Sequence, residues 1–204
     1  MRRFDRPHAV KEDGATPGLP ELADLLEERD PELSAHGARV AQHAEAIARA
    51  MGLPAPAIAR VRVAGRLHDL GKVWVSRDIL DKPGPLTERE WAEIRHHPRT
   101  AARLFQIAEL HDLADIVLAH HERPDGSGYP EGVPSGETPL EAQIVAVADV
   151  YDAMLSARPY APPLTPDEAR LELERVASQQ LDAHVVDAFL RVLDGSRQSR
   201  RAAG

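Results

Sequence analysis

Apolar residues recur every three to four positions along most of this chain, a spacing that is typical of amphipathic helices. Between residues 31 and 51 they keep this period until Gly52 interrupts it. Asp30 and Pro31 supply a capping residue and a proline at the first helical position. Almost no segment alternates with the period of strands. The pattern therefore predicts an all-α fold class.

Proline, glycine and capping signals delimit the other helices. Thr87 and Glu90 form a capping box that opens one helix, and Pro98 is expected to end or kink it at His97. The predicted helices cover residues 21–29, 31–51, 56–68, 87–97, 98–108, 110–121, 140–156, 166–180 and 182–193. Two segments rich in proline and glycine are predicted to be loops, namely 73–86 and 124–139.

The length of 204 residues is enough for one domain with a single substantial core. Residues 1–20 show no periodicity and are predicted to be a flexible leader. Residues 21–195 are predicted to form the domain, and residues 196–204 a polar tail.

Composition and charge exclude several classes of protein. The chain has no cysteine, so disulfides and thiolate metal sites are excluded. A net charge of −8 argues against binding to nucleic-acid polymers or anionic membranes. A substrate that carries phosphate remains compatible, provided that metal ions or a few lysines and arginines reverse the field locally. No apolar run reaches the ~20 residues that span a bilayer, and no signal core follows the N-terminus, so a cytoplasmic protein is expected.

Histidines and carboxylates lie at the ends or along one face of several predicted helices. His68 and Asp69 end an apolar helix, and taken alone they could be an ordinary polar helix end. The turn that follows brings Lys72 back toward this pair, where an ammonium could neutralise a phosphate. Glu32 and His36 are four residues apart and project from one helical face, although a solvated pair would look the same.

The strongest anomaly is Asp149, which lies in the apolar run 144–150 and is expected to be buried. A buried carboxylate without a partner is strongly unfavourable, so a cation is required, and a metal ion fits better than any nearby arginine. Of His96 and His97 only one can face a common centre, and we expect His97. A further pair closes a helix and could bind metal through both rings: His120 and His121. The remaining histidines are expected to have surface or capping roles: His8, His43, His96, His111 and His184.

Two motifs carry a resemblance to a known family. The chain reads His-Asp-x-Gly-Lys at 68–72 and His-His-Glu-x-x-Asp-Gly-x-Gly-Tyr-Pro at 120–130. Together with Asp149, these motifs resemble the HD superfamily of metal-dependent phosphohydrolases, and in particular its HD-GYP branch, the bacterial cyclic di-GMP phosphodiesterases. The resemblance extends over about residues 30–193. It implies a single-domain orthogonal helical array of about seven or eight helices, with metal ligands contributed by several helix ends.

The resemblance also implies a cofactor. Two or three divalent transition metals are expected, iron or manganese first and zinc or nickel as alternatives. Asp69 is expected to bridge two of them. The implied ligands are Glu32, His36, His68, Asp69, His97, His120, His121 and Asp149.

The implied activity is hydrolysis of cyclic di-GMP to linear pGpG, GMP or both, by attack of a metal-bridging hydroxide. Asp69 and Lys72 are the implied catalytic residues. The implied substrate contacts are Lys72, Gly128, Tyr129 and Arg158, although Tyr129 could equally well only pack its loop.

Departures from the family pattern keep other functions open. Leu155 and Ala161 replace a threonine and a lysine that family members usually carry beside Arg158. The alternatives are a phosphohydrolase for cyclic GMP-AMP or another nucleotide, and a non-catalytic module that senses a nucleotide or docks a protein. A homodimer or a signalling protein are the macromolecular partners that we consider.

Overall fold

The computed structural model describes residues 18–156 and 162–202, and within them it is built from helices. Their bounds are α1 Leu19–Arg29, α2 Pro31–Ala50, α3 Ala55–Leu67, η1 Leu70–Trp74, α4 Arg77–Leu80, α5 Glu88–Ile94, α6 His97–Ile107, α7 His111–Ala119, η2 Ser135–Glu137, α8 Leu140–Leu155, α9 Pro166–Val176 and α10 Ala183–Ala202. The described residues contain no strand, only an isolated bridge between Ala177 and Leu181. The all-α prediction is confirmed.

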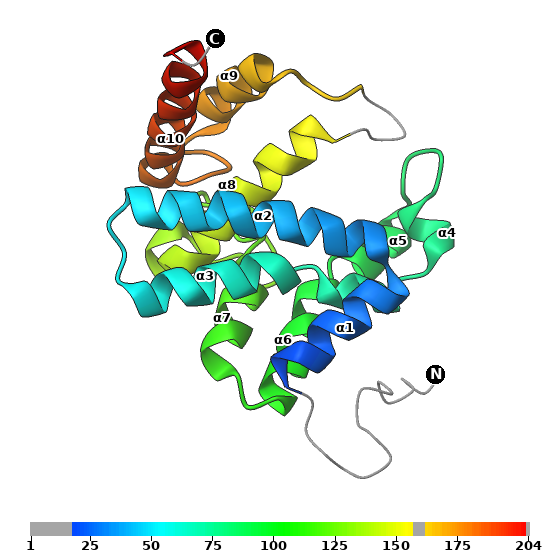
Figure 1. The fold of residues 1–204 in the computed structure, drawn as a ribbon. Helices are drawn as coiled ribbons and strands as arrows, with labels where there is room; N and C mark the ends of the chain where they lie inside the picture. The colour runs from blue at the N-terminus through cyan, green and yellow to red at the C-terminus, as the bar shows by residue number, and fades with distance from the viewer. Residues whose placement is uncertain (1–17, 157–161, 203–204) are drawn as a thin grey trace, which may run out of the picture.

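Helix α2 is the centre of the arrangement. In Figure 1 it crosses the molecule between α10 above and α3 below, and it also packs against α8. Two glycines let α2 and α3 approach closely. A Cβ on Gly37 would lie 2.2 Å from the carbonyl oxygen of Arg66, and one on Gly65 would lie 3.1 Å from the Cα of Ala41. Larger side chains here would push the two helices apart.

The core consists of aliphatic side chains and a few aromatic rings from α2, α3, α6, α7, α8 and α10. Val40, Val61, Phe105 and Phe189 are almost completely buried in it. His43 extends this core, because its ring centroid lies 5.2 Å from that of Tyr151 and 5.6 Å from that of Phe189. The expectation of a surface or capping role for His43 was therefore wrong.

The helix boundaries differ most from the predicted ones in three places. The predicted loop 73–86 contains α4, which Ser76 caps by accepting a hydrogen bond from the backbone N–H of Asp78. Helix α9 ends at Val176, and the backbone at Ser178 has a positive φ of 68°. Helix α10 continues to Ala202, because the polar residues after Gly195 tolerate a helix. The described residues hold ten α-helices, where the sequence pattern predicted nine and the resemblance implied about seven or eight.

The N-terminal boundary of the helical part differs slightly from the predicted one. Helix α1 begins at Leu19, inside the segment predicted as leader, while residues 1–17 lie outside the described part. The division into leader, domain and tail stays a prediction. Within the described residues, no helix combines the length and apolar character needed to cross a bilayer.

Candidate metal centre

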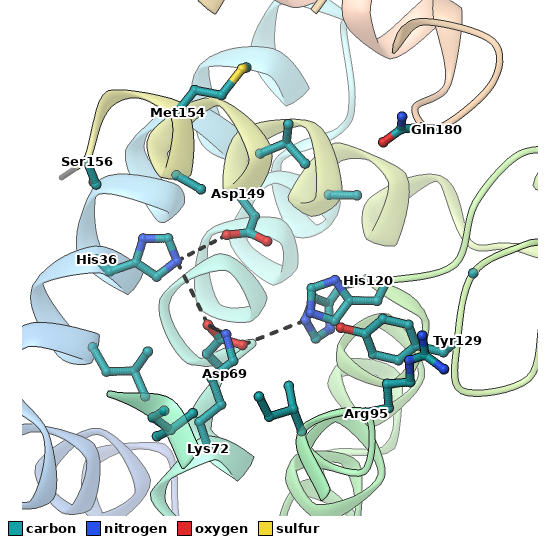
Figure 2. A pocket seen from close by; sticks show the side chains of 18 of the residues that line it. His36, Asp69, Lys72, Arg95, His120, Tyr129, Asp149, Met154, Ser156 and Gln180 are labelled. Carbon is teal, nitrogen blue, oxygen red and sulfur yellow. Dashed lines mark hydrogen bonds and ion pairs between the residues drawn. The ribbon is translucent and has the colours of Figure 1, made fainter. Parts of the chain in front are cut away.

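The predicted metal ligands and Lys72 lie together where several helices converge on one cavity of about 1110 Å³. Figure 2 shows His36 from α2 and Asp149 from α8 on one side, with Asp69 and His120 opposite them. The positions follow from the helix ends. His68 and Asp69 directly follow α3, and His120 directly follows α7. A helix end frees the backbone, so both members of a consecutive pair can turn inward.

Asp69 is the residue that joins the whole arrangement. One group whose ligand atoms all lie within 4.8 Å of one another contains His36, His68 and Asp69. A second such group contains Asp69, His97, His120 and His121. Asp69 belongs to both, as a carboxylate that bridges two ions must.

The two oxygens of Asp69 face different partners. Oδ1 lies 3.1 Å from Nε2 of His97. Oδ2 lies 3.3 Å from Nε2 of His68 and accepts a hydrogen bond of 2.6 Å from Nζ of Lys72. Lys72 thus reaches the pair through the short helix η1, as the sequence predicted. A Cβ on Gly71 would lie 2.0 Å from the carbonyl oxygen of His97, so the turn packs directly on α6.

Four histidines share one hydrogen-bonding pattern. Nδ1 of each of three histidines lies close to the carbonyl oxygen of the residue three positions before it. The distances are 2.9 Å from His68 to Gly65, 2.7 Å from His97 to Ile94 and 2.6 Å from His120 to Val117. Nδ1 of His36 lies 2.7 Å from Oδ2 of Asp152. Carbonyl and carboxylate oxygens only accept, so each Nδ1 carries a hydrogen and Nε2 is the nitrogen left to face the centre. This is the orientation that metal-binding histidines need.

Two buried atoms at the centre have unfilled hydrogen-bonding capacity. Nε2 of His68 and Oδ1 of Asp69 are fully buried and make no hydrogen bond to the described residues. Buried polar atoms are nearly always satisfied in folded proteins. A ligand set of imidazole nitrogens and carboxylate oxygens suits divalent metal ions, so the residues present fit the implied cofactor.

The electrostatics agree with a site prepared for cations. Burial alone would raise the pKa of Asp69, but the charges of Lys72 and His68 hold it well below its usual value. Burial would lower the pKa of His68, yet Asp69 and Asp149 raise it to about 10. Burial and the charge of His97 lower the pKa of His121 to about 3, so that ring stays neutral. The carboxylates therefore draw positive charge to the place where metal ions would bind.

Two of the predicted residues lie differently from what we expected, and a third is not described. Asp149 is not fully buried, because its side chain is 16% exposed where it borders the cavity. Its Oδ1 lies 3.1 Å from Nε2 of His36, and Asp149 belongs to neither ligand group. Glu32 lines the cavity but is exposed and belongs to neither ligand group. Arg158 lies outside the described residues, as does Ala161.

The loop after α7 folds back onto the metal centre. The backbone N–H of Tyr129 donates to the carbonyl oxygen of His121, and the two rings lie 4.6 Å apart. Gly128 is required by this fold-back, because a Cβ there would lie 2.4 Å from the backbone nitrogen of Arg123. Tyr129 therefore both packs its loop and lines the cavity, which joins the two roles that we had considered as alternatives.

Glu122 is a functional candidate that the sequence reasoning missed. Its side chain is buried and accepts backbone hydrogen bonds of 2.7, 3.2 and 3.1 Å from Glu131, Gly132 and Val133. These bonds close the loop that carries Tyr129. The signal was available, since a carboxylate directly after two candidate ligands is part of the second motif.

Asp152 and Arg39 were also missed. Asp152 is 2% exposed, contacts His36 and accepts hydrogen bonds of 2.8 and 3.0 Å from Arg39. Burial would raise the pKa of Asp152, but His36 and Arg39 lower it to about 2. Its spacing of three residues from Asp149 on the same helix could have revealed it.

The sequence matches a known protein family over most of its length. A model of the HD domain family matches residues 20–185. This chain belongs to the HD domain family. The resemblance drawn from the two motifs is thereby confirmed.

Individual relatives agree with this assignment. The chain is 42% identical over 176 residues to a cyclic di-GMP phosphodiesterase response regulator of Xanthomonas campestris, covering 85% of this chain and 47% of the relative. It is 35% identical to the 3′3′-cGAMP-specific phosphodiesterase 2 of Vibrio cholerae, covering 85% and 34%. This HD domain chain thus spans less than half the length of these relatives.

A solved structure supports the fold. An HDG"Y"P protein from Bdellovibrio bacteriovorus superimposes on this HD domain with a TM-score of 0.67 at 20% identity, covering 81% of this chain and 53% of that one. The helical array of the HD superfamily expected from the motifs is confirmed.

Proposed function

We propose that this chain is a metal-dependent phosphodiesterase that hydrolyses cyclic di-GMP. The observation that carries the proposal is that Asp69 belongs to two ligand groups at once, because a dinuclear centre is the arrangement that phosphodiester cleavage uses. Relatives at 42% and 35% identity are named as cyclic dinucleotide phosphodiesterases, which supports the substrate class.

The residues of the centre would share the work in a definite way. We assign the metal ions to His36, His68, Asp69, His97, His120, His121 and Asp149. When bound, divalent ions at such a site polarise a phosphate ester and activate water. Iron or manganese are our first expectation for their identity.

Lys72 would offset charge that develops on the phosphate. Its ammonium is held 2.6 Å from Asp69 and its side chain is 24% exposed, so it borders both the ligands and the cavity. Tyr129 is fixed against His121 and lines the same cavity. Burial raises the pKa of Tyr129, so it would remain a neutral hydrogen-bond donor to the substrate at physiological pH.

Cyclic GMP-AMP is the second candidate substrate, since one of the relatives above is named as specific for it. We also propose that the protein is located in the cytoplasm and that it forms a homodimer or binds a signalling protein.

The test is turnover by the purified, metal-loaded chain of cyclic di-GMP, cyclic GMP-AMP and cyclic di-AMP, with products separated by chromatography. We expect cyclic di-GMP to be consumed fastest, and the products will distinguish pGpG from GMP. Asp69→Asn is the matched inactive control. Binding of a cyclic dinucleotide without turnover by a metal-replete protein would support the sensing alternative instead.

A further inference from the structure

The cavity extends well beyond the metal centre, to a wall formed by α5 and the loop after α7. Trp91 of α5 and Arg95, the residue that caps the C-terminus of α5, line it, as do Arg123 and Tyr129 of the loop. Figure 2 draws Arg95 beside Tyr129, on the other side of His120 from His36. The positive charges of Arg95 and Arg123 both act on the Tyr129 hydroxyl and lower its pKa, against the larger effect of burial. The two arginines and Tyr129 thus form one wall.

Arg95 and Arg123 differ from the other arginines around the cavity. Arg39 is bound to Asp152 and Arg77 lies 2.8 Å from Asp30. Within residues 18–156 and 162–202, by contrast, neither Arg95 nor Arg123 forms an ion pair or a side-chain hydrogen bond. Both are exposed. In a chain of net charge −8, two guanidinium groups without an ion-pair partner on a cavity wall can form a local site for an anion.

The guanidinium of Arg95 is also oriented. It lies over the ring of Trp91, 5.5 Å from the ring centroid, and Trp91 is 40% exposed. A guanidinium that rests on an aromatic face keeps its N–H groups directed outward in its own plane, ready for bidentate contact with a phosphate.

We propose that Arg95 and Arg123 bind the second phosphate of the cyclic dinucleotide, the one that is not being cleaved, and that Trp91 is a positioning residue for Arg95. This inference rests on the proposed function. A cyclic dinucleotide carries two phosphodiesters, and the ligand groups around Asp69 with Lys72 can engage only one at a time. The remaining phosphate needs cations elsewhere on the wall, where Arg95 and Arg123 lie.

The test compares Arg95→Gln and Arg123→Gln with Arg103→Gln in the metal-loaded protein. Arg103 lies on α6, is exposed and does not line the cavity, so it controls for the change in net charge. Each cavity variant should raise KM for cyclic di-GMP about tenfold with kcat nearly unchanged, as loss of a hydrogen bond to a charged group predicts. KM for bis(4-nitrophenyl) phosphate, which has a single phosphate, should not change.

Trp91 has its own pair of variants. Trp91→Phe keeps an aromatic face and should keep the parent KM, whereas Trp91→Ala should raise it. A purely structural role would instead lower the melting temperature of both without this difference in KM.

Calorimetric affinity for a hydrolysis-resistant phosphorothioate analogue of cyclic di-GMP separates the two proposals. Weaker binding by Arg95→Gln and Arg123→Gln than by Arg103→Gln supports the subsite, whether or not the parent turns over the substrate. Equal affinities for all three variants would overturn it. A KM that rises equally for the single phosphodiester would overturn it as well, because the arginines would then act on the phosphate at the metal centre.

Discussion

Nδ1 of His36 lies 2.7 Å from Oδ2 of Asp152, while Nε2 of the same ring lies 3.1 Å from Oδ1 of Asp149. The two carboxylates belong to one helix, three residues apart, and the histidine to another. Asp152 therefore holds the hydrogen on Nδ1 of His36, the nitrogen that points away from Asp149. Arg39 holds Asp152 in place through its hydrogen bonds. The link joins α2 to α8 directly beside the candidate metal centre.

We expect Asp152→Ala to weaken metal binding in the group that contains His36. The ring of His36 loses the carboxylate that orients it, and such changes commonly cost about 10–100-fold in metal affinity. Metal titration followed by mass spectrometry would measure the loss. Arg49→Ala, which removes an exposed ion pair with Glu45 elsewhere on α2, is the control and should leave the affinity unchanged.

Asp69→Ala should reduce metal content at more than one position, because this carboxylate belongs to both ligand groups. Glu32→Ala should leave two metals per chain in place, because Glu32 is exposed and outside both groups. Elemental analysis of the two purified variants would measure the number of metal ions per chain. Full metal content in Asp69→Ala would contradict a bridging role.

Lys72→Ala should lower kcat for cyclic di-GMP while the metals stay bound. The ammonium acts on developing charge, and removal of such a donor typically costs about 10²–10³-fold. Loss of its charge should also raise the pKa of Asp69, which Lys72 helps to hold down. Lys82→Ala, at an ion pair with Glu90 outside the ligand groups, should leave kcat unchanged.

Glu122→Gln should loosen the loop that carries Tyr129. The glutamate accepts three backbone hydrogen bonds in a buried position, and an unsatisfied buried group costs about 1–3 kcal/mol. We expect a lower free energy of unfolding and a higher KM for cyclic di-GMP. Glu131→Gln, at an exposed ion pair with Arg99, should change stability far less. Unchanged stability in Glu122→Gln would show that the loop is held by other contacts.

His43 should make the fold sensitive to acid. Burial lowers its pKa from 6.5, so the folded protein favours the neutral ring. Its contribution to stability is therefore present above the unfolded pKa and is lost as pH falls through the lower folded pKa. Melting temperatures between pH 7 and pH 5 should fall less steeply for His43→Phe than for the parent. His184→Gln, at an exposed position, should follow the parent.

The sequence by itself determined the fold class, most helix bounds and the candidate ligands. Helical periodicity and capping signals are local, so Asp30 and the Thr87 box located helix starts correctly. The residues of the two motifs do lie together at the candidate metal centre, because their spacing at helix ends reflects the geometry of that centre. Asp149 stood out because a carboxylate in an apolar run needs a partner.

Only the tertiary structure decided which residues share a space. It joined His36 and Arg39 of α2 to Asp152, which lies 116 positions after His36 in the chain. It made Glu122 the anchor of a loop, packed the half-buried His43 against core aromatic rings and left Glu32 exposed. It also brought Arg95 to the wall of Tyr129. Contacts between distant segments depend on how helices pack, and no periodicity within one helix records which face of another it will meet.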